Sequence, residues 1–252
     1  MQPISIRYLY NSGFAVETAS HFLIFDYYLD TPHGGSPEQG VIDPSMLQKR
    51  NVVVFVSHSH ADHYNPVIFE WRKGHSNIRY ILAEEIPTKE EVLSVHPSRT
   101  YDLGDLQVRT LDSTDLGVAF LIKTDGLCLY HAGDLNWWHW NDEPEQANQD
   151  MARRYQEQID SLQGESIDCA FIPVDPRQEE NSLLGLEYFM KKVGARWIVP
   201  MHFGSQYTIF DRIDHDPRTF PYRNRVLHIS HRGQLLQISN KPSNIKRASQ
   251  KS

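Results

Sequence analysis

The chain has 252 residues, of which 40% are hydrophobic and 23% are charged. This ordinary globular composition excludes disorder over most of the chain, and the length suffices for one large α/β domain or two small ones. The formal net charge of −7 argues against a general nucleic-acid binder, because such proteins neutralise phosphates with a basic surface. It leaves room for a local basic pocket that binds one phosphorylated small molecule.

The two cysteines, Cys128 and Cys169, each lie inside an apolar run, which predicts buried thiols rather than a disulfide framework or a cysteine metal site. The first residues, Met1 to Ile4, do not combine a basic region with an apolar stretch, so no signal peptide is expected. No apolar run approaches the roughly 20 residues that span a bilayer. We therefore expect a soluble, cytoplasmic protein that does not bind a membrane.

The first half of the chain predicts strands and one helix. Alternating or compact apolar runs predict strands at 4–10, 22–25, 52–56 and 78–82. The run at 52–56 is apolar on both faces, which indicates a strand that is buried on both sides. Asn65 and Pro66 predict the start of a helix, as N-cap and first helical residue, and Gly74 predicts its end.

The second half of the chain predicts further strands that alternate with helices. Strands at 118–123 and 127–131 flank the turn Thr124-Asp125-Gly126 and form a hairpin. The remaining elements are, in chain order, a polar external helix at 145–162, a buried strand at 167–174, a helix at 183–193, a strand at 197–202, a short helix at 209–213 and a strand pair split by Arg232-Gly233.

These elements contain no internal repeat, low-complexity region or linker. We therefore expect one domain over residues 1–239, in which strands are covered by helices in an α/β sandwich. The tail at 240–252 is polar and basic, which predicts disorder.

The strand at 52–56 runs directly into Ser57-His58-Ser59-His60-Ala61-Asp62-His63. Imidazole nitrogens and carboxylate oxygens are the ligands that zinc and similar divalent ions take at catalytic sites. On an extended or tightly turned loop, His58 and His60 project to the same side, whereas Asp62 and His63 face a second position nearby. This packing suits two metal ions about 3.5–4 Å apart that clamp a bridging hydroxide.

The segment resembles the signature H-x-H-x-D-H of the metallo-β-lactamase superfamily, and the resemblance extends over roughly residues 4–238. It implies a four-layer αββα sandwich with the metal site at one edge of two facing sheets. It also implies that Asp26, after the strand at 22–25, supports the site without binding metal. The implied ligands are His58 and His60 for the first metal, Asp62, His63 and His202 for the second, and Asp134 as the bridge.

One position departs from the pattern of the superfamily, which normally supplies a third histidine for the first metal from a loop before the bridging aspartate. The corresponding segment, 111–118, contains no histidine. The alternatives for that place are Asp115, Asp112, a water molecule, or His131 from the neighbouring strand. Oxygen in place of nitrogen would harden the first site and favour Mn²⁺ or Fe²⁺ over Zn²⁺. The resemblance therefore implies one or two Zn²⁺ ions, with Mn²⁺ or Fe²⁺ as alternatives.

Three further residues, together with Asp115, are candidates for contact with a substrate. Trp137 and Trp138 belong to the segment Leu135-Asn136-Trp137-Trp138-His139-Trp140. This segment is interpreted either as an aromatic wall over the metal site or as an anchor for the external helix. Arg177 follows the strand at 167–174, where it either binds a phosphate or carboxylate of the substrate or forms a surface salt bridge.

The combined hypothesis is a metal-dependent hydrolase in which a metal-bound hydroxide attacks a carbonyl carbon or a phosphorus atom. Asp62 or Asp134 would orient the nucleophile or accept the proton. The chain resembles compact cytoplasmic members of the superfamily, including the ascorbate-6-phosphate lactonase-like group. That resemblance implies a small ester, lactone or phosphodiester substrate, phosphorylated metabolites included, and no nucleic acid as partner.

Two other functions stay open at this point. One is a non-catalytic metal-binding or ligand-binding protein of the same fold. This hypothesis stays open because the third histidine of the first metal site is missing. The other is a di-metal redox enzyme, although that branch of the superfamily typically has glutamate where this chain has His60.

Overall fold

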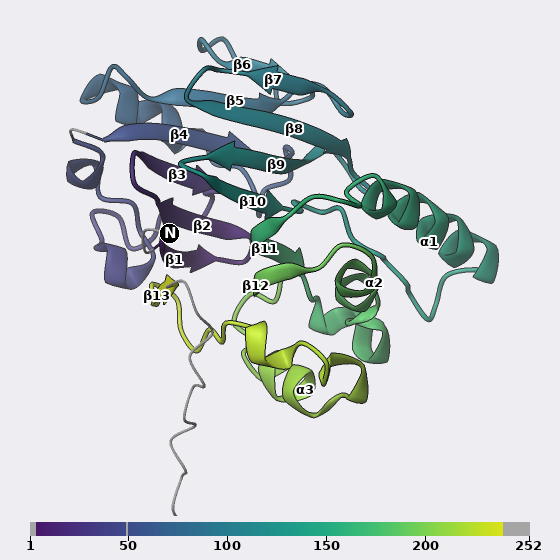
Figure 1. The fold of residues 1–252 in the computed structure, drawn as a ribbon. Coiled ribbons are helices and arrows are strands. Elements are labelled where there is room, and N and C mark those ends of the chain that lie inside the picture. The colour runs from purple at the N-terminus through teal and green to yellow at the C-terminus, as the bar shows by residue number, and fades with distance from the viewer. Residues whose placement is uncertain (1–3, 49, 239–252) are drawn as a thin grey trace, which may run out of the picture.

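Figure 1 shows the computed structural model, which describes residues 4–48 and 50–238 as two β-sheets flanked by helices. The first sheet contains β1 (Ile4–Tyr10), β2 (Gly13–Glu17), β3 (His21–Phe25), β4 (Asn51–Val56), β5 (Arg79–Ala83), β6 (Leu93–Val95) and β13 (Leu235–Ile238). The second contains β7 (Thr100–Asp102), β8 (Leu106–Asp112), β9 (Val118–Thr124), β10 (Leu127–His131), β11 (Ile167–Pro173) and β12 (Ala195–Met201). Neighbouring strands follow the order β13-β1-β2-β3-β4-β5-β6 in the first sheet and β12-β11-β10-β9-β8-β7 in the second.

Helices connect the strands and cover the sheets. The α-helices are α1 (Glu145–Asp160), α2 (Leu184–Lys192) and α3 (Ile209–His215). The 3₁₀ helices are η1 (Pro37–Gln39), η2 (Pro44–Leu47), η3 (Pro66–Lys73), η4 (Pro176–Asn181), η5 (Pro217–Thr219) and η6 (Arg223–Arg225). Within the described residues, no helix combines the length and the apolar character needed to cross a membrane.

Aromatic side chains from both sheets fill the space between them. Phe25 of β3 and Phe55 of β4 stack with ring centroids 5.0 Å apart, and Phe55 contacts Phe120 of β9 in the facing sheet at 5.2 Å. Phe14 of β2 contacts Phe171 of β11 at 4.8 Å. These rings join the two sheets into one core, because each buries a large apolar area against the opposite layer.

The outer faces of the sheets are covered by helices, which gives four layers. On the second sheet, Tyr130 of β10 stacks on Phe189 of α2 with ring centroids 5.4 Å apart. On the first sheet, η3 buries Ile68 and Trp71, and Tyr80 of β5 donates a hydrogen bond to the carbonyl oxygen of Ile68. The predicted four-layer αββα sandwich is therefore confirmed.

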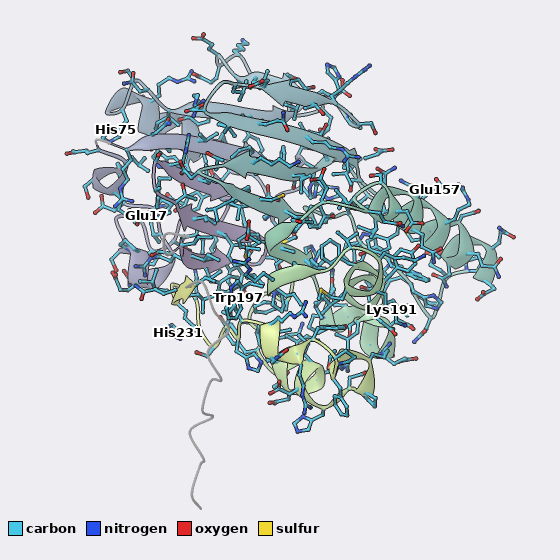
Figure 2. The ribbon with its side chains drawn as sticks, viewed as in Figure 1. Glu17, His75, Glu157, Lys191, Trp197 and His231 are labelled. Atoms are coloured by element: carbon cyan, nitrogen blue, oxygen red, sulfur yellow. The ribbon has the colours of Figure 1, made fainter. Side chains whose placement is uncertain are left out.

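Charged side chains lie on the outer side of the covering helices. Glu157 of α1 pairs with Arg153 at 2.8 Å, one helical turn away, and Lys191 of α2 pairs with Glu187 in the same way at 2.6 Å. Figure 2 shows Glu157 and Lys191 on that outer side, away from the packed space between the sheets. This division of polar and apolar faces is the one expected of surface helices.

The predicted helix at 65–74 begins and ends close to the expected residues, but it is the 3₁₀ helix η3 rather than an α-helix. The side chain of Asn65 accepts a hydrogen bond from the backbone nitrogen of Val67, and Pro66 is the first helical residue. Because a 3₁₀ helix has three residues per turn, the spacing of three between Ile68 and Trp71 places both on the buried face.

The predicted hairpin of β9 and β10 is confirmed, and its turn residues Asp125 and Gly126 have φ of 52° and 72°, as a type I′ turn requires. The apolar pattern of the sequence does not predict β2, β6, β7 or β8. The pattern predicts a C-terminal strand pair, of which one strand forms within the described residues. That strand, β13, pairs antiparallel with β1, with Ile4 opposite Ile238, because the edge of the first sheet offers it a partner. The predicted tail at 240–252 lies outside the described residues.

Polar residues follow the parallel strands where these end at one edge of the sandwich. Strands β3 and β4 are parallel neighbours in the first sheet, and β10, β11 and β12 are parallel neighbours in the second. The carboxyl ends of parallel strands meet at the same edge of a sheet, where α/β proteins bind ligands. The residues within three positions of these ends include Asp26, His58, Asp134, Asp175 and His202.

Candidate metal centre

The signature loop begins at Ser57, directly after β4, and Asp26 at the end of β3 fixes its backbone. Ser57 donates hydrogen bonds from its backbone nitrogen and its Oγ to the carboxylate of Asp26, at 2.8 and 2.7 Å. Asp26 has φ 42° and His202 has φ 63°, in the left-handed region that side chains with a Cβ rarely adopt. Backbone strain of this kind clusters at functional sites, where the surrounding structure over-determines it.

Three buried histidines are each held through the Nδ1 atom. Nδ1 of His58 lies 2.9 Å from Oγ of Ser57, and Nδ1 of His63 lies 2.8 Å from Oδ2 of Asp26. Nδ1 of His202 lies 3.1 Å from Oδ2 of Asp175. A hydrogen bond at Nδ1 fixes the orientation of an imidazole and leaves Nε2 as the atom that can bind a metal.

The Nε2 atoms of these three histidines point into the site without a hydrogen bond. Within the described part of the chain, His58 Nε2, His63 Nε2, His202 Nε2 and Asp134 Oδ1 are buried and lack a hydrogen-bond partner. Buried polar atoms are nearly always satisfied, so four such atoms side by side indicate a ligand that is a cation. A divalent ion fits these donors, since neutral imidazole and carboxylate are its usual ligands.

Asp62, His63 and His202 form one ligand group, and Asp134 faces it. Oδ1 of Asp134 lies 3.2 Å from Nε2 of His63 and 3.4 Å from Nε2 of His202. Oδ2 of Asp62 lies 3.8 and 3.6 Å from the same two nitrogens. A tetrahedral ion with bonds of about 2.1 Å separates its ligand atoms by roughly 3.4 Å, so these spacings fit one ion.

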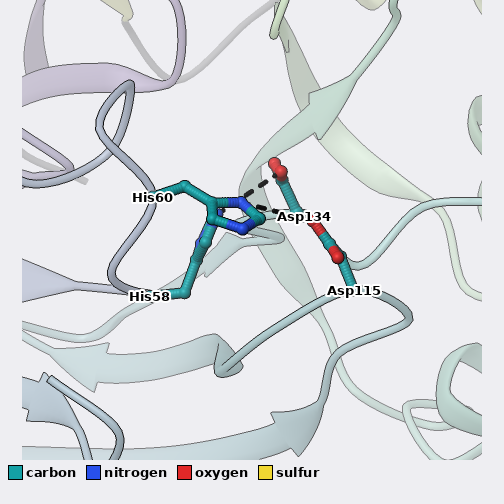
Figure 3. A group of neighbouring side chains, drawn as sticks. All are labelled: His58, His60, Asp115 and Asp134. Carbon is teal, nitrogen blue, oxygen red and sulfur yellow. Dashed lines mark ion pairs between the residues drawn. The ribbon is translucent and has the colours of Figure 1, made fainter.

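His58, His60, Asp115 and Asp134 form the other ligand group, which Figure 3 shows with the four side chains converging from three loops. Nε2 of His58 lies 3.5 Å from Oδ2 of Asp134, and Nδ1 of His60 lies 3.5 Å from Oδ2 of Asp115. Asp134 therefore directs one oxygen to each group. The structure divides the histidines and aspartates of the signature into the same two groups that the resemblance implies, with Asp134 between them.

The charges in the site also call for a cation. Burial works to raise the pKa of Asp134, but the facing rings of His63 and His202 hold it far below its ordinary value. Burial works to lower the pKa of His63, but the carboxylates of Asp134 and Asp26 outweigh it and raise that pKa well above the ordinary value. Burial and the neighbouring His63 lower the pKa of His58 to about 4. Neutral imidazole rings carry no charge, so within the two ligand groups a divalent ion would supply the positive charge that balances the carboxylates of Asp62, Asp115 and Asp134.

Two glycines let the ligand-bearing loops approach the signature loop. A Cβ on Gly117 would lie 1.9 Å from the backbone oxygen of Ser57, and a Cβ on Gly133 would lie 2.7 Å from Cβ of Ser57. Both glycines also have positive φ, of 67° and 53°. Asp115 precedes Gly117 by two residues and Asp134 follows Gly133 directly, so the close approach brings both carboxylates to the histidines.

Two of the alternatives for the missing third histidine are wrong. His131 is buried between the sheets, where its Nε2 lies 2.9 Å from the carbonyl oxygen of Ser12 and its Nδ1 accepts a hydrogen bond from the backbone of Gly133. Its ring stacks on Phe25 and does not reach the ligand groups. Asp112 ends β8 with an exposed side chain and belongs to neither group.

A cavity of about 360 Å³ lies over the two ligand groups. Its walls come from loops and from α1. Three of the lining residues, Thr114, Trp140 and Met151, are not among the predicted site residues. Trp140 belongs to the tryptophan-rich segment that was singled out, whereas Met151 carries no signal in the sequence. The residues that line the cavity are His60, Asp62, Thr114, Asp115, Asp134, Trp138, Trp140, Met151, Arg177 and His202.

The tryptophan-rich segment serves both of the purposes considered for it, through different residues. Trp138 lines the cavity, donates a hydrogen bond from Nε1 to the backbone oxygen of Asp134 and contacts His202 edge-on. Trp137 instead packs against Tyr155 of α1 and Tyr188 of α2, with centroids 6.3 and 6.0 Å away. Trp137 therefore anchors the helices and does not line the cavity, which corrects its prediction as a substrate contact.

Arg177 lies at the cavity and is paired within the protein. Its Nε and Nη2 donate to both carboxylate oxygens of Asp175, at distances of 2.5 to 3.0 Å. Asp175 in turn holds His202 through Nδ1. Arg177 therefore forms the predicted salt bridge and also lines the cavity, and its contact with a substrate stays a prediction.

The comparisons with known proteins agree with this architecture. Two curated relatives bear the name of metal-dependent hydrolases. The one from Opitutus terrae is 28% identical over 151 residues, covering 51% of this chain and 62% of that protein, which is less than two thirds of its length. The one from Bacillus velezensis is 25% identical over 247 residues, covering 86% of this chain and 91% of that protein.

A metallo hydrolase from the archaeon Ignicoccus hospitalis has a solved structure that is similar, with a TM-score of 0.67 at 14% identity, covering 95% of this chain and 100% of that one. A likeness at this level of identity shows the fold. The family described as the β-lactamase superfamily domain matches residues 5–152, which is more than half of the chain. Together with the fold, this match shows that the chain belongs to the metallo-β-lactamase superfamily.

Proposed function

We propose that this metal-dependent hydrolase of the metallo-β-lactamase superfamily cleaves a small anionic ester, lactone or phosphodiester. The observation that carries the proposal is that Asp134 directs one carboxylate oxygen to each ligand group inside a cavity of about 360 Å³. A divalent ion held there lowers the pKa of a bound water and polarises a carbonyl or phosphoryl oxygen.

Asp62 is the carboxylate best placed to orient a reacting water or to accept its proton. Its side chain is 47% exposed and lines the cavity, whereas that of Asp134 is 6% exposed. Nδ2 of Asn11 donates a hydrogen bond to Oδ2 of Asp62 at 3.1 Å, which fixes one oxygen and directs the carboxylate. General bases must lie within hydrogen-bond reach of the proton that they take, and Asp62 meets that condition for a molecule in the cavity.

The cavity sets the size and charge of the substrate. Its volume lies at the small end of the range of about 300–1,000 Å³ that small-molecule sites occupy. Trp138 and Trp140 lie nearly parallel, with ring planes 2° apart and centroids 6.0 Å apart, and form an apolar wall. The guanidinium of Arg177 lies 5.9 Å from the centroid of Trp140 and supplies positive charge beside that wall. These features favour a small substrate with an anionic group and an apolar part.

The alternative of a non-catalytic binding protein is motivated by the missing third histidine. Asp115 beside His60 offers a carboxylate in place of that donor, which supports the catalytic proposal over this alternative. Zn²⁺ as the resident ion and a cytoplasmic location stay predictions from the sequence, and so does the expectation that nucleic acid is not a partner.

The proposal is tested with the purified full chain, by elemental analysis of bound metal and by hydrolysis of bis(4-nitrophenyl) phosphate and a simple lactone. We expect metal in the wild type and a fall in kcat of roughly 10²–10⁴-fold in Asp62→Ala, the range for loss of general acid–base catalysis. The control is Asp150→Ala, an exposed position on α1, which should leave the rate unchanged. Equal rates in the wild type and Asp62→Ala would contradict the hydrolytic assignment.

A further inference from the structure

We propose that Asp115 is a ligand of the first metal ion, and that this carboxylate shifts the preference of the first site from Zn²⁺ toward Mn²⁺ or Fe²⁺. The inference rests on the proposed metal-dependent function, and it concerns which ion is bound rather than which substrate is cleaved. Carboxylate oxygen suits harder ions such as Mn²⁺, whereas imidazole suits Zn²⁺, so replacing one nitrogen donor by oxygen changes the relative affinities.

The position of Asp115 matches that of a ligand. Ligand atoms of His58, His60, Asp115 and Asp134 all lie within 4.8 Å of one another. The separation of 3.5 Å between Nδ1 of His60 and Oδ2 of Asp115 is close to the roughly 3.4 Å expected between two ligands of a tetrahedral ion. Asp115 thus completes a group of two imidazoles and two carboxylates.

The loop that carries Asp115 is fastened to both metal-binding loops. Val118 donates a backbone hydrogen bond to the oxygen of Ser57 at 3.0 Å, which ties the loop to the signature loop. Oγ1 of Thr114 donates to the backbone oxygen of Asn136 at 2.7 Å, which ties it to the loop that follows Asp134. Oγ of Ser113 accepts a hydrogen bond from the backbone nitrogen of Asp115 at 3.1 Å. These contacts hold Asp115 in place before any ion binds.

The loop is also fastened on the side of α1. Nη2 of Arg154 donates a hydrogen bond to the backbone oxygen of Ser113 at 3.1 Å. On the opposite side of the site, Oε1 of Glu85 accepts a hydrogen bond from the backbone nitrogen of Ser59, between the two histidines of the first group. Both partners of the pair His60 and Asp115 therefore project from anchored backbone, although their side chains are 45% and 42% exposed.

The carboxylate of Asp115 makes the two metal sites alike in their donors. The second group offers two imidazoles and Asp62, and Asp134 is shared, so each ion meets two nitrogen and two carboxylate donors. A third histidine in place of Asp115 would leave the first site with three nitrogens. The carboxylates of Asp62, Asp115 and the shared Asp134 would therefore carry three negative charges toward two divalent ions.

The test uses full-length protein that a chelator has freed of metal, with calorimetric titration of Zn²⁺ and of Mn²⁺ alone and the electron paramagnetic resonance spectrum of bound Mn²⁺. We compare the wild type with Asp115→His, Asp115→Asn and the control Asp112→His, which places the same side chain on the neighbouring strand end outside both groups. Far-ultraviolet circular dichroism of each metal-free variant verifies the fold.

We expect two ions per chain in the wild type and in Asp112→His. Asp115→Asn should lose at least about tenfold in affinity for one of the two ions, and Asp115→His should raise the ratio of Zn²⁺ to Mn²⁺ affinity at that site by about tenfold or more. Wild-type affinities in Asp115→Asn, or an unchanged ratio in Asp115→His, would overturn the inference alone. A folded wild type that binds neither ion would overturn the proposed function with it.

Discussion

The two edges of the sandwich each bury a histidine between carboxylates, but they differ in whether both ring nitrogens of that histidine have hydrogen-bond partners. At the metal edge, His63 uses Nδ1 to contact Asp26, while its Nε2 is buried without a hydrogen-bond partner. At the opposite edge, where β3 begins, both ring nitrogens of His21 have partners. Its Nε2 lies 3.0 Å from Asp105, and its Nδ1 lies 3.3 Å from Asp125.

The carboxylate of Asp105 at the opposite edge has its partners within the protein. Arg79 donates to both carboxylate oxygens of Asp105 at 2.8 and 2.9 Å, and Asn51 donates to the same carboxylate at 2.9 Å. The cluster joins the two sheets, because His21 and Arg79 belong to the first sheet and Asp105 and Asp125 adjoin strands of the second. The comparison teaches that unpaired donor atoms, rather than the number of histidines and carboxylates, distinguish a metal centre from a structural cluster.

The largest effect is expected when the carboxylate shared by the two ligand groups is removed at the metal edge. Asp134→Ala removes the carboxylate that faces both ligand groups, so we expect loss of bound metal and a fall in hydrolytic rate of about a thousandfold or more, equivalent to several kcal/mol of lost stabilisation. Elemental analysis and a hydrolysis assay measure both effects. The matched change Asp105→Ala, at the opposite edge, should leave the metal content per folded chain unchanged, and a loss of metal there would remove the distinction between the edges.

Metal binding should also stabilise the fold, because the ion binds the folded chain far better than the unfolded one. Adding Zn²⁺ or Mn²⁺ at about a thousandfold excess over Kd to chelator-treated protein contributes about 4 kcal/mol, which corresponds to a rise in Tm of roughly 10 °C. Thermal denaturation followed by circular dichroism measures it. His63→Ala should remove the part of the rise that the ion of the second ligand group contributes, whereas His21→Ala should lower Tm but retain the full rise. A full rise in His63→Ala would show that the ion binds elsewhere.

A smaller effect is expected from the residue that orients a metal-binding histidine. Asp175→Asn weakens the contact with Nδ1 of His202, and we expect metal affinity to fall about 10–100-fold, as for other partners of metal-bound histidines. Competition with a coloured chelator measures the affinity.

The chain supplies a matched control for that variant. Asp216-Pro217-Arg218 repeats the sequence Asp175-Pro176-Arg177, and Arg218 pairs with Asp216 in the same way, but α3 and η5 carry this copy rather than the metal site. Asp216→Asn should therefore leave metal affinity at the wild-type value. Equal losses in the two variants would mean that Asp175 acts on stability rather than on His202.

The smallest effect concerns acid stability at the opposite edge. Burial works to raise the pKa of Asp125, but hydrogen bonds from Thr18 and Ser20 lower it to about 2. Because the pKa is depressed in the folded chain, the stability contributed by Asp125 is present above about pH 4 and is lost as the pH falls toward 2. Asp125→Asn should lower Tm by a few degrees at pH 6, with a difference from the wild type that shrinks by pH 3. A difference that stays constant would show that the charge of Asp125 is irrelevant.

The sequence predicts most of the strands that carry the site, because their apolar runs are continuous or strictly alternating. It predicts β4 and the loop after it, since five apolar residues lead directly into the signature. It does not predict β6 and β7, which are three residues long and have no period to detect. In β8 the alternation of apolar and polar residues begins at Leu106 but is interrupted at Thr110, a polar residue that is buried.

In the candidate site, too, some residues can be predicted from the sequence and others cannot. The signature residues lie close together in sequence, so their convergence follows from one loop, whereas Asp115 becomes distinguishable from Asp112 and His131 only when the loop is folded. Asp112 and Asp115 are three residues apart, and which one turns inward depends on the contacts of Thr114 and Gly117. For the same reason the prediction selects Trp137 and not Trp140, whereas Trp140 lines the cavity, because a loop has no period that assigns a side to each residue.

Gly117 and Gly133 have a consequence for changing this protein by design. The spacing of the ligand-bearing loops is set by contacts between backbone and glycine, not by the side chains at positions 115 and 134, so new donor groups can be installed there on an unaltered scaffold. A library aimed at new metals or new reactions should therefore diversify the carboxylates and keep both glycines fixed. A side chain at 117 or 133 would clash with Ser57 and push the loop that carries Asp115 or Asp134 away from the histidines.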